Sequence, residues 1–145
     1  MKTLIHATVC ALLAGLITMP VLAKQAGKEE AGCLSAYHKV HEALAKDDLA
    51  DAKKGATDLA IKAKAANNQT IAEHADALAK SDSLDAAREH FKAISDECIK
   101  MAANVEGQYV FNCPMVKADW LQTSKDEVEN PYMGKKMLTC GQLKK

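Results

Sequence analysis

Two short pairs of sulfur-containing residues near the C-terminus have the types and spacing of a soft-metal site. Cys113 and Met115 are two positions apart, so an extended backbone points both side chains to one face. Met137 and Cys140 are three positions apart, a spacing that one helical or tight turn brings together. Thiolates and thioethers select Cu(I) and related soft ions over hard cations. These four residues are therefore a candidate soft-metal site.

The same two cysteines also support a structural interpretation. A Cys113–Cys140 disulfide would staple a poorly helical segment, and Met115, Met137 and Trp120 would then form only the small core of that segment. Cys-x-Met is a much weaker motif than paired Cys-x-x-Cys. The residues alone leave both interpretations open.

Residues 1–23 have the pattern of a cleavable signal peptide. A positive charge at Lys2 precedes a largely apolar run, and Ala23 ends a small-x-small cleavage pattern. Cleavage there leaves 122 of the 145 residues, which is enough for one domain. We expect a periplasmic or secreted protein with no stable membrane insertion after cleavage. Within it we expect a flexible segment at residues 24–32 and a single domain at residues 33–145.

The charge and cysteine content of the cleaved chain limit its partners. It carries 18 basic and 19 acidic residues, and no interleaving of basic and aromatic residues indicates a nucleic acid partner. Four cysteines remain, and an even number in an oxidising compartment first suggests disulfides. Four cysteines allow three pairings, and the sequence does not choose among them.

The composition changes near residue 105. Residues 31–104 are rich in Ala, Lys, Asp and Leu, which is typical of helices. Residues 107–145, here called the C-terminal extension, hold both prolines, four of the six aromatic residues and three of the four methionines of the cleaved chain. We expect this extension to be irregular, with a short β-hairpin as an alternative.

Four apolar stripes with helical spacing divide the first part of the chain. Residues three and four apart share one helical face, so each stripe predicts a helix. The stripes are Leu34, Tyr37, His41 and Leu44; Leu49, Ala52, Ala56, Leu59 and Ala63; Ile71, Ala75 and Leu78; and Leu84, Ala87, Phe91, Ile94, Cys98 and Met101. Short connections make consecutive helices antiparallel, so the predicted fold is all-α, an up-down four-helix bundle with the C-terminal extension.

Polar residues indicate where three of these helices begin. Asp48 and Asp82 place acidic groups at two helix starts, and Thr70 with Glu73 fits a capping box. These signals separate the second, third and fourth predicted helices.

The alternation of helices also suggests a cysteine pair. We expect Cys33 to open the first helix, at the same end of the bundle as the second half of the fourth helix, which contains Cys98. A Cys33–Cys98 disulfide is therefore our hypothesis. The alternative is that Cys98 is simply a small buried apolar residue.

Histidines add weaker candidate ligands. His38 and His41 are three apart, a spacing that can chelate a metal. His41 lies on an apolar stripe, where a histidine is more often a hydrogen-bonded core residue, so we keep it, with Met133, as a weaker ligand of the soft-metal site. His74 and His90 lie on separate predicted helices without a visible partner, and we expect both to face solvent.

Several strings in the chain resemble a bacterial domain of unknown function, the 3347 family. In the C-terminal extension they are Phe111-Asn112-Cys113-Pro114-Met115, Trp120-Leu121-Gln122 and residues 130–141. Nearer the N-terminus, the stretch from Tyr37 to Asp48 followed by Ala52-Lys53-Lys54 resembles the family's opening helix pair. The resemblance covers about Leu34 to Gly141, and Cys33 and Cys98 are not among the residues of the family's hallmark.

The resemblance implies a functional context. The domain occurs as a stand-alone secreted protein and fused to periplasmic adaptor subunits of copper/silver-type heavy-metal efflux pumps. It therefore implies a periplasmic soft-metal binding protein linked to heavy-metal resistance or efflux, with Cu(I) or a related ion bound at Cys113, Met115, Met137 and Cys140. A heavy-metal efflux adaptor or another envelope protein would be its partner.

The alternative function is a disulfide-stapled periplasmic interaction module without metal binding. We do not expect an enzyme, because the chain has no Cys-x-x-Cys motif and no strand–helix alternation of a thioredoxin-like sheet. It also has no Ser/His/Asp arrangement with a nucleophile elbow.

Overall fold

The computed structural model describes residues 19–144, with side chains from Gly27 onward. Most of the expected signal peptide, residues 1–18, lies outside this range. The described chain forms helices α1 (Met19–Ala45), α2 (Leu49–Ala65), α3 (Gln69–Ala79) and α4 (Leu84–Met101), strands β1 (Tyr109–Cys113), β2 (Ala118–Gln122) and β3 (Gln142–Leu143), and the short 3-10 helix η1 (Gly134–Lys136). Within residues 19–144 no helix is long and apolar enough to cross a membrane.

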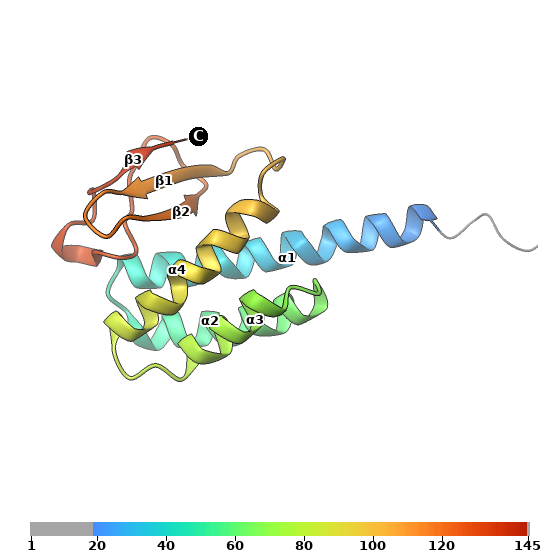
Figure 1. Cartoon of the computed structure of the whole chain (residues 1–145), viewed down its shortest axis with the longest axis horizontal. Helices are drawn as coiled ribbons and strands as arrows, with labels where there is room; N and C mark the ends of the chain where they lie inside the picture. The colour runs from blue at the N-terminus through green and yellow to red at the C-terminus, as the bar shows by residue number, and fades with distance from the viewer. Residues whose placement is uncertain (1–18, 145) are drawn as a thin grey trace, which may run out of the picture.

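Helix α1 begins earlier than the apolar stripe predicts. It starts at Met19, so residues 24–32, expected to be a flexible segment, are helical, and Cys33 lies inside the helix rather than opening it. Residues 24–32 contain Lys, Gln, Ala and Glu, which favour helices, and no proline or β-branched residue interrupts them. The N-terminal part of α1 extends beyond the other helices (Figure 1), so the apolar stripe marks only the packed part of the helix.

Side-chain caps fix the starts of the other three helices. Asp48 caps α2, which begins where this acidic residue predicted a helix start. Asn68 caps α3, so the capping box predicted at Thr70 is wrong, and Ser83 rather than Asp82 caps α4. Each capping side chain accepts a hydrogen bond from the N–H three residues further on, which satisfies one of the free donors of the first turn.

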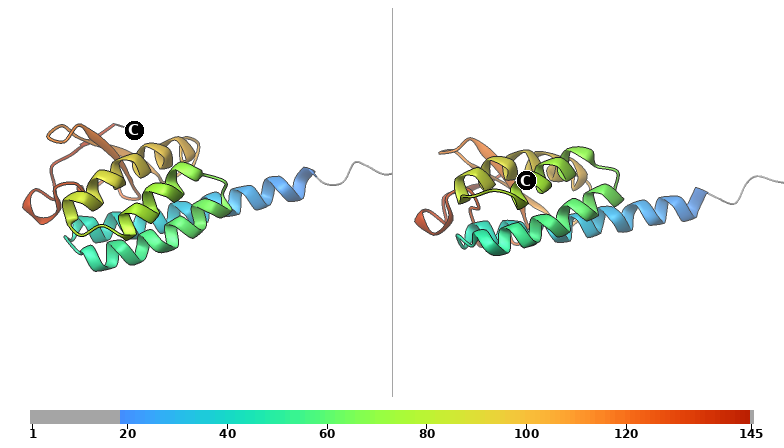
Figure 2. Two further views of the ribbon diagram at one scale, coloured as in Figure 1. Left: turned by 60° about the horizontal axis from the view of Figure 1, so that its bottom comes forward. Right: turned by 90° about the horizontal axis from the view of Figure 1, so that it is seen from below.

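Each helix packs against the next one along the chain, and α4 also contacts α1. Successive helices alternate in direction, because the connections at residues 46–48, 66–68 and 80–83 are too short for any other arrangement (Figures 1 and 2). Small side chains line the contacts and let the helices approach closely. The fully buried alanines of α2, α3 and α4 are Ala52, Ala56, Ala63, Ala72, Ala75 and Ala87.

The C-terminal extension is more regular than predicted. Its strands form an antiparallel sheet in the order β2-β1-β3, with Phe111 opposite Trp120 and Asn112 opposite Gln142. The hairpin alternative is confirmed, and the expectation of an irregular extension is wrong for these strands. Aromatic and β-branched residues at the start of β1 favour an extended backbone. A tight turn at residues 114–117, with Lys117 at a φ of 51°, returns the chain into β2.

The sheet covers the side of α1 and α4 that faces away from α2 and α3 (Figure 1). The buried hydroxyl of Tyr37 on α1 lies at the centre of this contact. It accepts a hydrogen bond from the Leu121 N–H at 3.0 Å and shares one with the Ser95 hydroxyl at 2.9 Å. One phenol thus connects α1, α4 and β2.

Arg88 of α4 ties the C-terminal extension to the turn between α1 and α2. Its guanidinium donates to the Pro131 carbonyl at 2.8 Å, to the Leu44 carbonyl at 3.0 Å and to the Asp47 carboxylate at 2.5 Å. Asp47 also accepts a hydrogen bond from the Lys135 N–H at 3.1 Å. These contacts hold the segment before Cys140 against the C-terminal end of α1.

Candidate functional site

Cys113 and Cys140 lie together at one end of the sheet. Cys113 is the last residue of β1, and Cys140 lies two residues before β3. The two strands are antiparallel, with Asn112 opposite Gln142. The C-terminal end of β1 therefore lies beside the residues that directly precede β3. The two thiols are neighbours, and each shifts the pKa of the other. Cys113 is buried and Cys140 is half-buried, so solvent reaches the pair from the Cys140 side.

Several donors converge on the Cys113 sulfur. Burial raises the pKa of this thiol, but hydrogen bonds from the Val116 N–H, the Asn130 side chain, the Met115 N–H and the Cys140 thiol lower it by more. The pKa of Cys113 is therefore below its ordinary value. Burial and the neighbouring Cys113 sulfur raise the pKa of the Cys140 thiol. Cys113 is thus the thiolate-forming member of the pair.

Asn130 organises this pair, and sequence analysis missed it as a functional residue. Its side chain is fully buried and donates to the Cys113 sulfur and to the Cys140 carbonyl. Its amide oxygen accepts hydrogen bonds from the Tyr132 N–H at 2.9 Å and the Met133 N–H at 3.1 Å. The Asn-Pro dipeptide that begins at this position was the available signal, because asparagine often bonds to the backbone of the turn that it starts.

The three methionines of the C-terminal extension differ in how deeply they are buried. Met115 lies in the turn after β1 with 64% of its surface exposed, and Met137 follows η1 with 38% exposed. The interpretation with a Cys113–Cys140 disulfide placed Met115, Met137 and Trp120 in a small core. Trp120 is fully buried, but the two methionines are exposed. Met133 packs against the hydrophobic core, which uses its side chain for packing. Met115 and Met137 are therefore the methionines available to a ligand.

Cys33 and Cys98 also meet, across α1 and α4. The interaction with Cys98 lowers the pKa of Cys33. Burial and the charge of Glu30 raise this pKa by less, so it lies below its ordinary value. Burial and the Cys33 sulfur raise the pKa of Cys98 well above its ordinary value. Both residues are fully buried, and the proximity inferred from the alternating helices is confirmed.

Neither expected disulfide is present in the structure. Cys33, Cys98, Cys113 and Cys140 are all free thiols. The fold brings the two members of each expected pair into hydrogen-bond contact without bonding their sulfurs, so both pairs are dithiols here.

His41 is a core histidine whose Nε2 atom is already engaged. It is almost fully buried and donates to the Glu129 carbonyl at 2.7 Å. Burial lowers its pKa to about 4, so the ring is neutral. His38 bonds the Gln108 side chain at 2.8 Å instead of joining His41. Across residues 19–144 no three His, Cys, Asp or Glu side chains gather in a way that could hold a metal ion.

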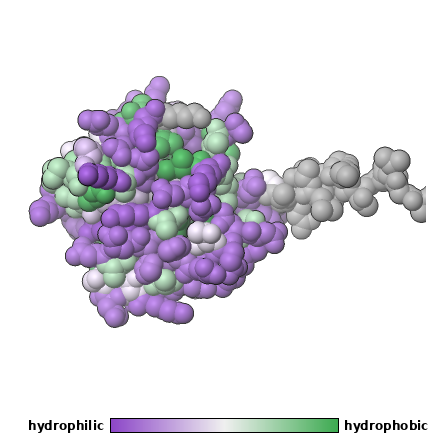
Figure 3. Space-filling view, viewed as in Figure 1, coloured by the Kyte–Doolittle hydropathy of each residue, from purple (hydrophilic) through white to green (hydrophobic). Residues whose placement is uncertain are grey.

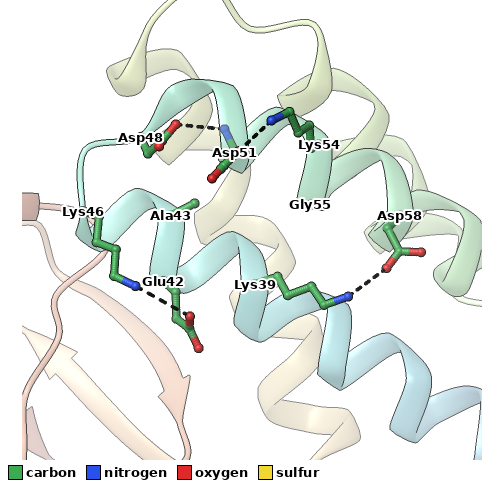
Figure 4. A pocket seen from close by; sticks show the side chains of 9 residues that line it. All are labelled: Lys39, Glu42, Ala43, Lys46, Asp48, Asp51, Lys54, Gly55 and Asp58. Carbon is green, nitrogen blue, oxygen red and sulfur yellow. Dashed lines mark hydrogen bonds and ion pairs between the residues drawn. The ribbon is translucent and has the colours of Figure 1, made fainter.

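A charged groove lies between α1 and α2 (Figure 4). Its side chains form ion pairs with one another, namely Lys39–Asp58 at 3.7 Å, Lys46–Glu42 at 3.8 Å and Lys54–Asp51 at 2.8 Å. Exposed pairs of this kind are typical of a solvated surface. The groove contains neither a thiol nor an unpaired cation, and we assign it no function.

Comparison with known proteins identifies a family but no characterised relative. No curated protein and no solved structure matches the chain. A family model described as a protein of unknown function, DUF3347, matches residues 33–109, which run from the middle of α1 to the first residue of β1. The matched part ends before the pair of Cys113 and Cys140, so those residues lie beyond the matched region. Because the match spans more than half of the 145 residues, the chain belongs to the DUF3347 family.

Proposed function

We propose that this protein binds Cu(I), or a related soft metal ion, through Cys113 and Cys140. The observation that supports this function is the contact between the two thiols, which are 27 residues apart in the chain. Metal binding requires thiolates, and the donors around Cys113 favour its thiolate. The half-buried Cys140 leaves an approach for the ion.

Met115 and Met137 would supply thioether ligands to the same ion. No third His, Cys, Asp or Glu joins the thiol pair within residues 19–144, so a further protein ligand has to come from another residue type. Met115 is in the turn whose N–H groups contact Cys113, and the Met137 carbonyl accepts a hydrogen bond from the Cys140 N–H at 3.0 Å. Both positions adjoin the thiols, and thioethers are soft ligands.

The four helices would act as a rigid support for this site. In our proposal they form an up-down four-helix bundle, which holds the C-terminal extension through Tyr37 and Arg88. The protein would be exported by the segment at residues 1–23 and work in the periplasm or outside the cell. There it would buffer the ion or pass it to a heavy-metal efflux adaptor or another envelope protein.

Anaerobic titration of the reduced protein with Cu(I), in competition with a chelator of known affinity, tests the proposal. We expect a one-to-one complex in the parent protein and its loss in Cys113→Ser and Cys140→Ser. Met115→Leu and Met137→Leu should weaken binding on the order of tenfold each, since each removes a soft ligand. Binding of equal strength in the Cys113→Ser/Cys140→Ser double variant would overturn the proposal.

Two matched controls separate ligand loss from structural damage. Met133→Leu makes the same chemical change as the other methionine variants but at a residue packed on the core, so it should leave the affinity unchanged. Cys98→Ser removes one thiol of the other pair and should also retain the ion. If all methionine variants behave alike, the thioether part of the proposal is wrong.

A second candidate function is an interaction module that binds no metal. Three apolar side chains of the C-terminal extension are exposed, Met115 at 64%, Leu143 at 51% and Met137 at 38%. In Figure 3 apolar surface is visible among hydrophilic residues on the side where Figure 1 places the sheet. Leu143→Ser should then weaken association with an envelope partner while leaving Cu(I) titration unchanged. If Leu143→Ser changes neither the association with the partner nor the Cu(I) titration, the interaction module is not supported.

A further inference from the structure

His74 and His90 form an interhelical pair, although sequence analysis expected both to face solvent separately. His74 lies on α3 and His90 on α4, and their Nδ1 atoms are 3.3 Å apart. The ring centroids are 5.6 Å apart and the ring planes are inclined by 47°. Both side chains are half-buried, so the two rings are held by packing yet remain within reach of an ion from solvent.

We propose that His74 and His90 form a binding site for a divalent late transition-metal ion, such as Zn²⁺ or Ni²⁺. Imidazole nitrogen suits these ions, unlike the thiolate and thioether set proposed for Cu(I). Two nitrogens 3.3 Å apart, each about 2.0–2.1 Å from a shared metal ion, subtend an angle of about 104–111° at the ion, close to tetrahedral. The observed separation therefore matches that of two ligands on one ion. Water molecules complete the coordination.

Binding needs a change of tautomer in the pair and a rotation of the rings, because the lone pairs must point at the ion and no longer along the line between the nitrogens. In the hydrogen bond between the rings, one Nδ1 carries a proton and the other accepts it. Coordination requires the lone pair of both Nδ1 atoms. The donor ring therefore moves its proton from Nδ1 to Nε2 through solvent, and this exchange of tautomer releases no net proton.

The surroundings of the pair favour a cation. Glu73 and Glu89 directly precede the two histidines and are exposed. Arg88 and Lys92 are the basic residues two positions from His90 along α4, and each is paired, with Asp47 at 2.5 Å and with Glu89 at 2.7 Å. The site uses none of the sulfur ligands of the proposed Cu(I) site, so either proposal can fail without the other.

Titration of the reduced full chain with Ni²⁺ and with Zn²⁺, followed by ¹⁵N NMR of the histidine rings, tests the site. Zn²⁺ should shift the Nδ1 resonances of His74 and His90 and leave those of His38 and His41 in place. Isothermal titration with Ni²⁺ should show a loss on the order of tenfold or more in His74→Gln and in His90→Gln, because each leaves a single imidazole. His38→Gln is the matched control and should bind as the parent does.

Three outcomes are informative. Unchanged Ni²⁺ affinity in the His74→Gln/His90→Gln double variant overturns the site, as does a Zn²⁺-induced shift confined to other histidines of the parent protein. The parent NMR measurement decides the question even if a variant fails to fold. Retained binding in Cys113→Ser/Cys140→Ser, with loss in the histidine variants, assigns the divalent ion to the helices and not to the thiols.

Discussion

The side chain of Asn130 lies beside the sulfur of Cys113 and lowers the pKa of that thiol, and both residues are fully buried. The two are 17 positions apart in the chain: Cys113 ends β1, and Asn130 directly precedes the turn before η1. This contact makes the two thiols of the proposed site unequal, because it favours the thiolate at Cys113 only. It also joins the turn that precedes η1 to the end of β1.

Replacing Asn130 by alanine should raise the pKa of Cys113, because the thiolate loses one of its donors. We also expect a loss of about 1–3 kcal/mol in the free energy of unfolding, since the Tyr132 and Met133 N–H groups lose their acceptor. The Cβ chemical shift of ¹³C-labelled cysteine, followed against pH, reports the pKa. Asn112→Ala is the control, because that amide bonds to Asp119 at 2.6 Å. A titration of Cys113 that is unmoved in Asn130→Ala would contradict the assignment.

His41 should make the protein sensitive to acid. Its pKa is about 4 in the folded protein and about 6.5 when unfolded, so the unfolded chain binds the extra proton first as the pH falls. The stabilisation is complete above pH 6.5 and is lost between pH 6.5 and 4, by about 3 kcal/mol in total. Urea unfolding at a series of pH values should show this slope.

His41→Gln should remove most of that slope while still offering a donor to the Glu129 carbonyl. His38→Gln should reduce the slope less, since His41 remains. An unchanged pH profile in His41→Gln shows that other groups cause the acid sensitivity.

Gly134→Ala should be strongly destabilising. Gly134 has a φ of 53°, and an added Cβ would collide with the Asp47 carboxylate and the Arg88 guanidinium. We expect a loss of about 2 kcal/mol or more from the combined strain and broken contacts. Gly27→Ala is the matched control, because Gly27 is helical with open space around it and should gain about 0.5–1 kcal/mol. Thermal unfolding of both variants checks the contrast, which fails if the two changes have the same sign.

Tyr37→Phe should cost about 1–3 kcal/mol, because the buried Leu121 N–H loses its acceptor and Ser95 loses its partner. Hydrogen exchange should show the fastest new exchange at the Leu121 amide of β2. Tyr109→Phe makes the same change at a half-buried position and should cost much less. Equal losses in the two variants would show that the Tyr37 hydroxyl does not carry the contact between helices and sheet.

The sequence predicted most of what depends on neighbouring residues. The apolar stripes identified four helices, and α4 runs from Leu84 to Met101, the two ends of its stripe. The start of α2 at Asp48 was also predicted, because a helix start depends on residues close together in the chain, here Asp48 and the N–H three positions on. The start of α1 was missed, since no apolar stripe marks residues 24–32 in the sequence, and residues 27–32 are exposed or half-buried. The starts predicted at Thr70 and Asp82 lie two residues and one residue from the observed caps, Asn68 and Ser83. Several side chains that can cap a helix are adjacent at both places, and the sequence does not choose among them.

By itself, then, the sequence determined the helices and the residue types that can bind a soft ion. Only the tertiary structure decided which of those residues meet. In the folded chain Cys113 lies beside Cys140 and Asn130. Met133 and His41 pack in or against the core. His74 of α3 contacts His90 of α4. The physical reason is that a helix depends on contacts three or four residues apart, whereas these pairs depend on packing between segments that are distant in the chain.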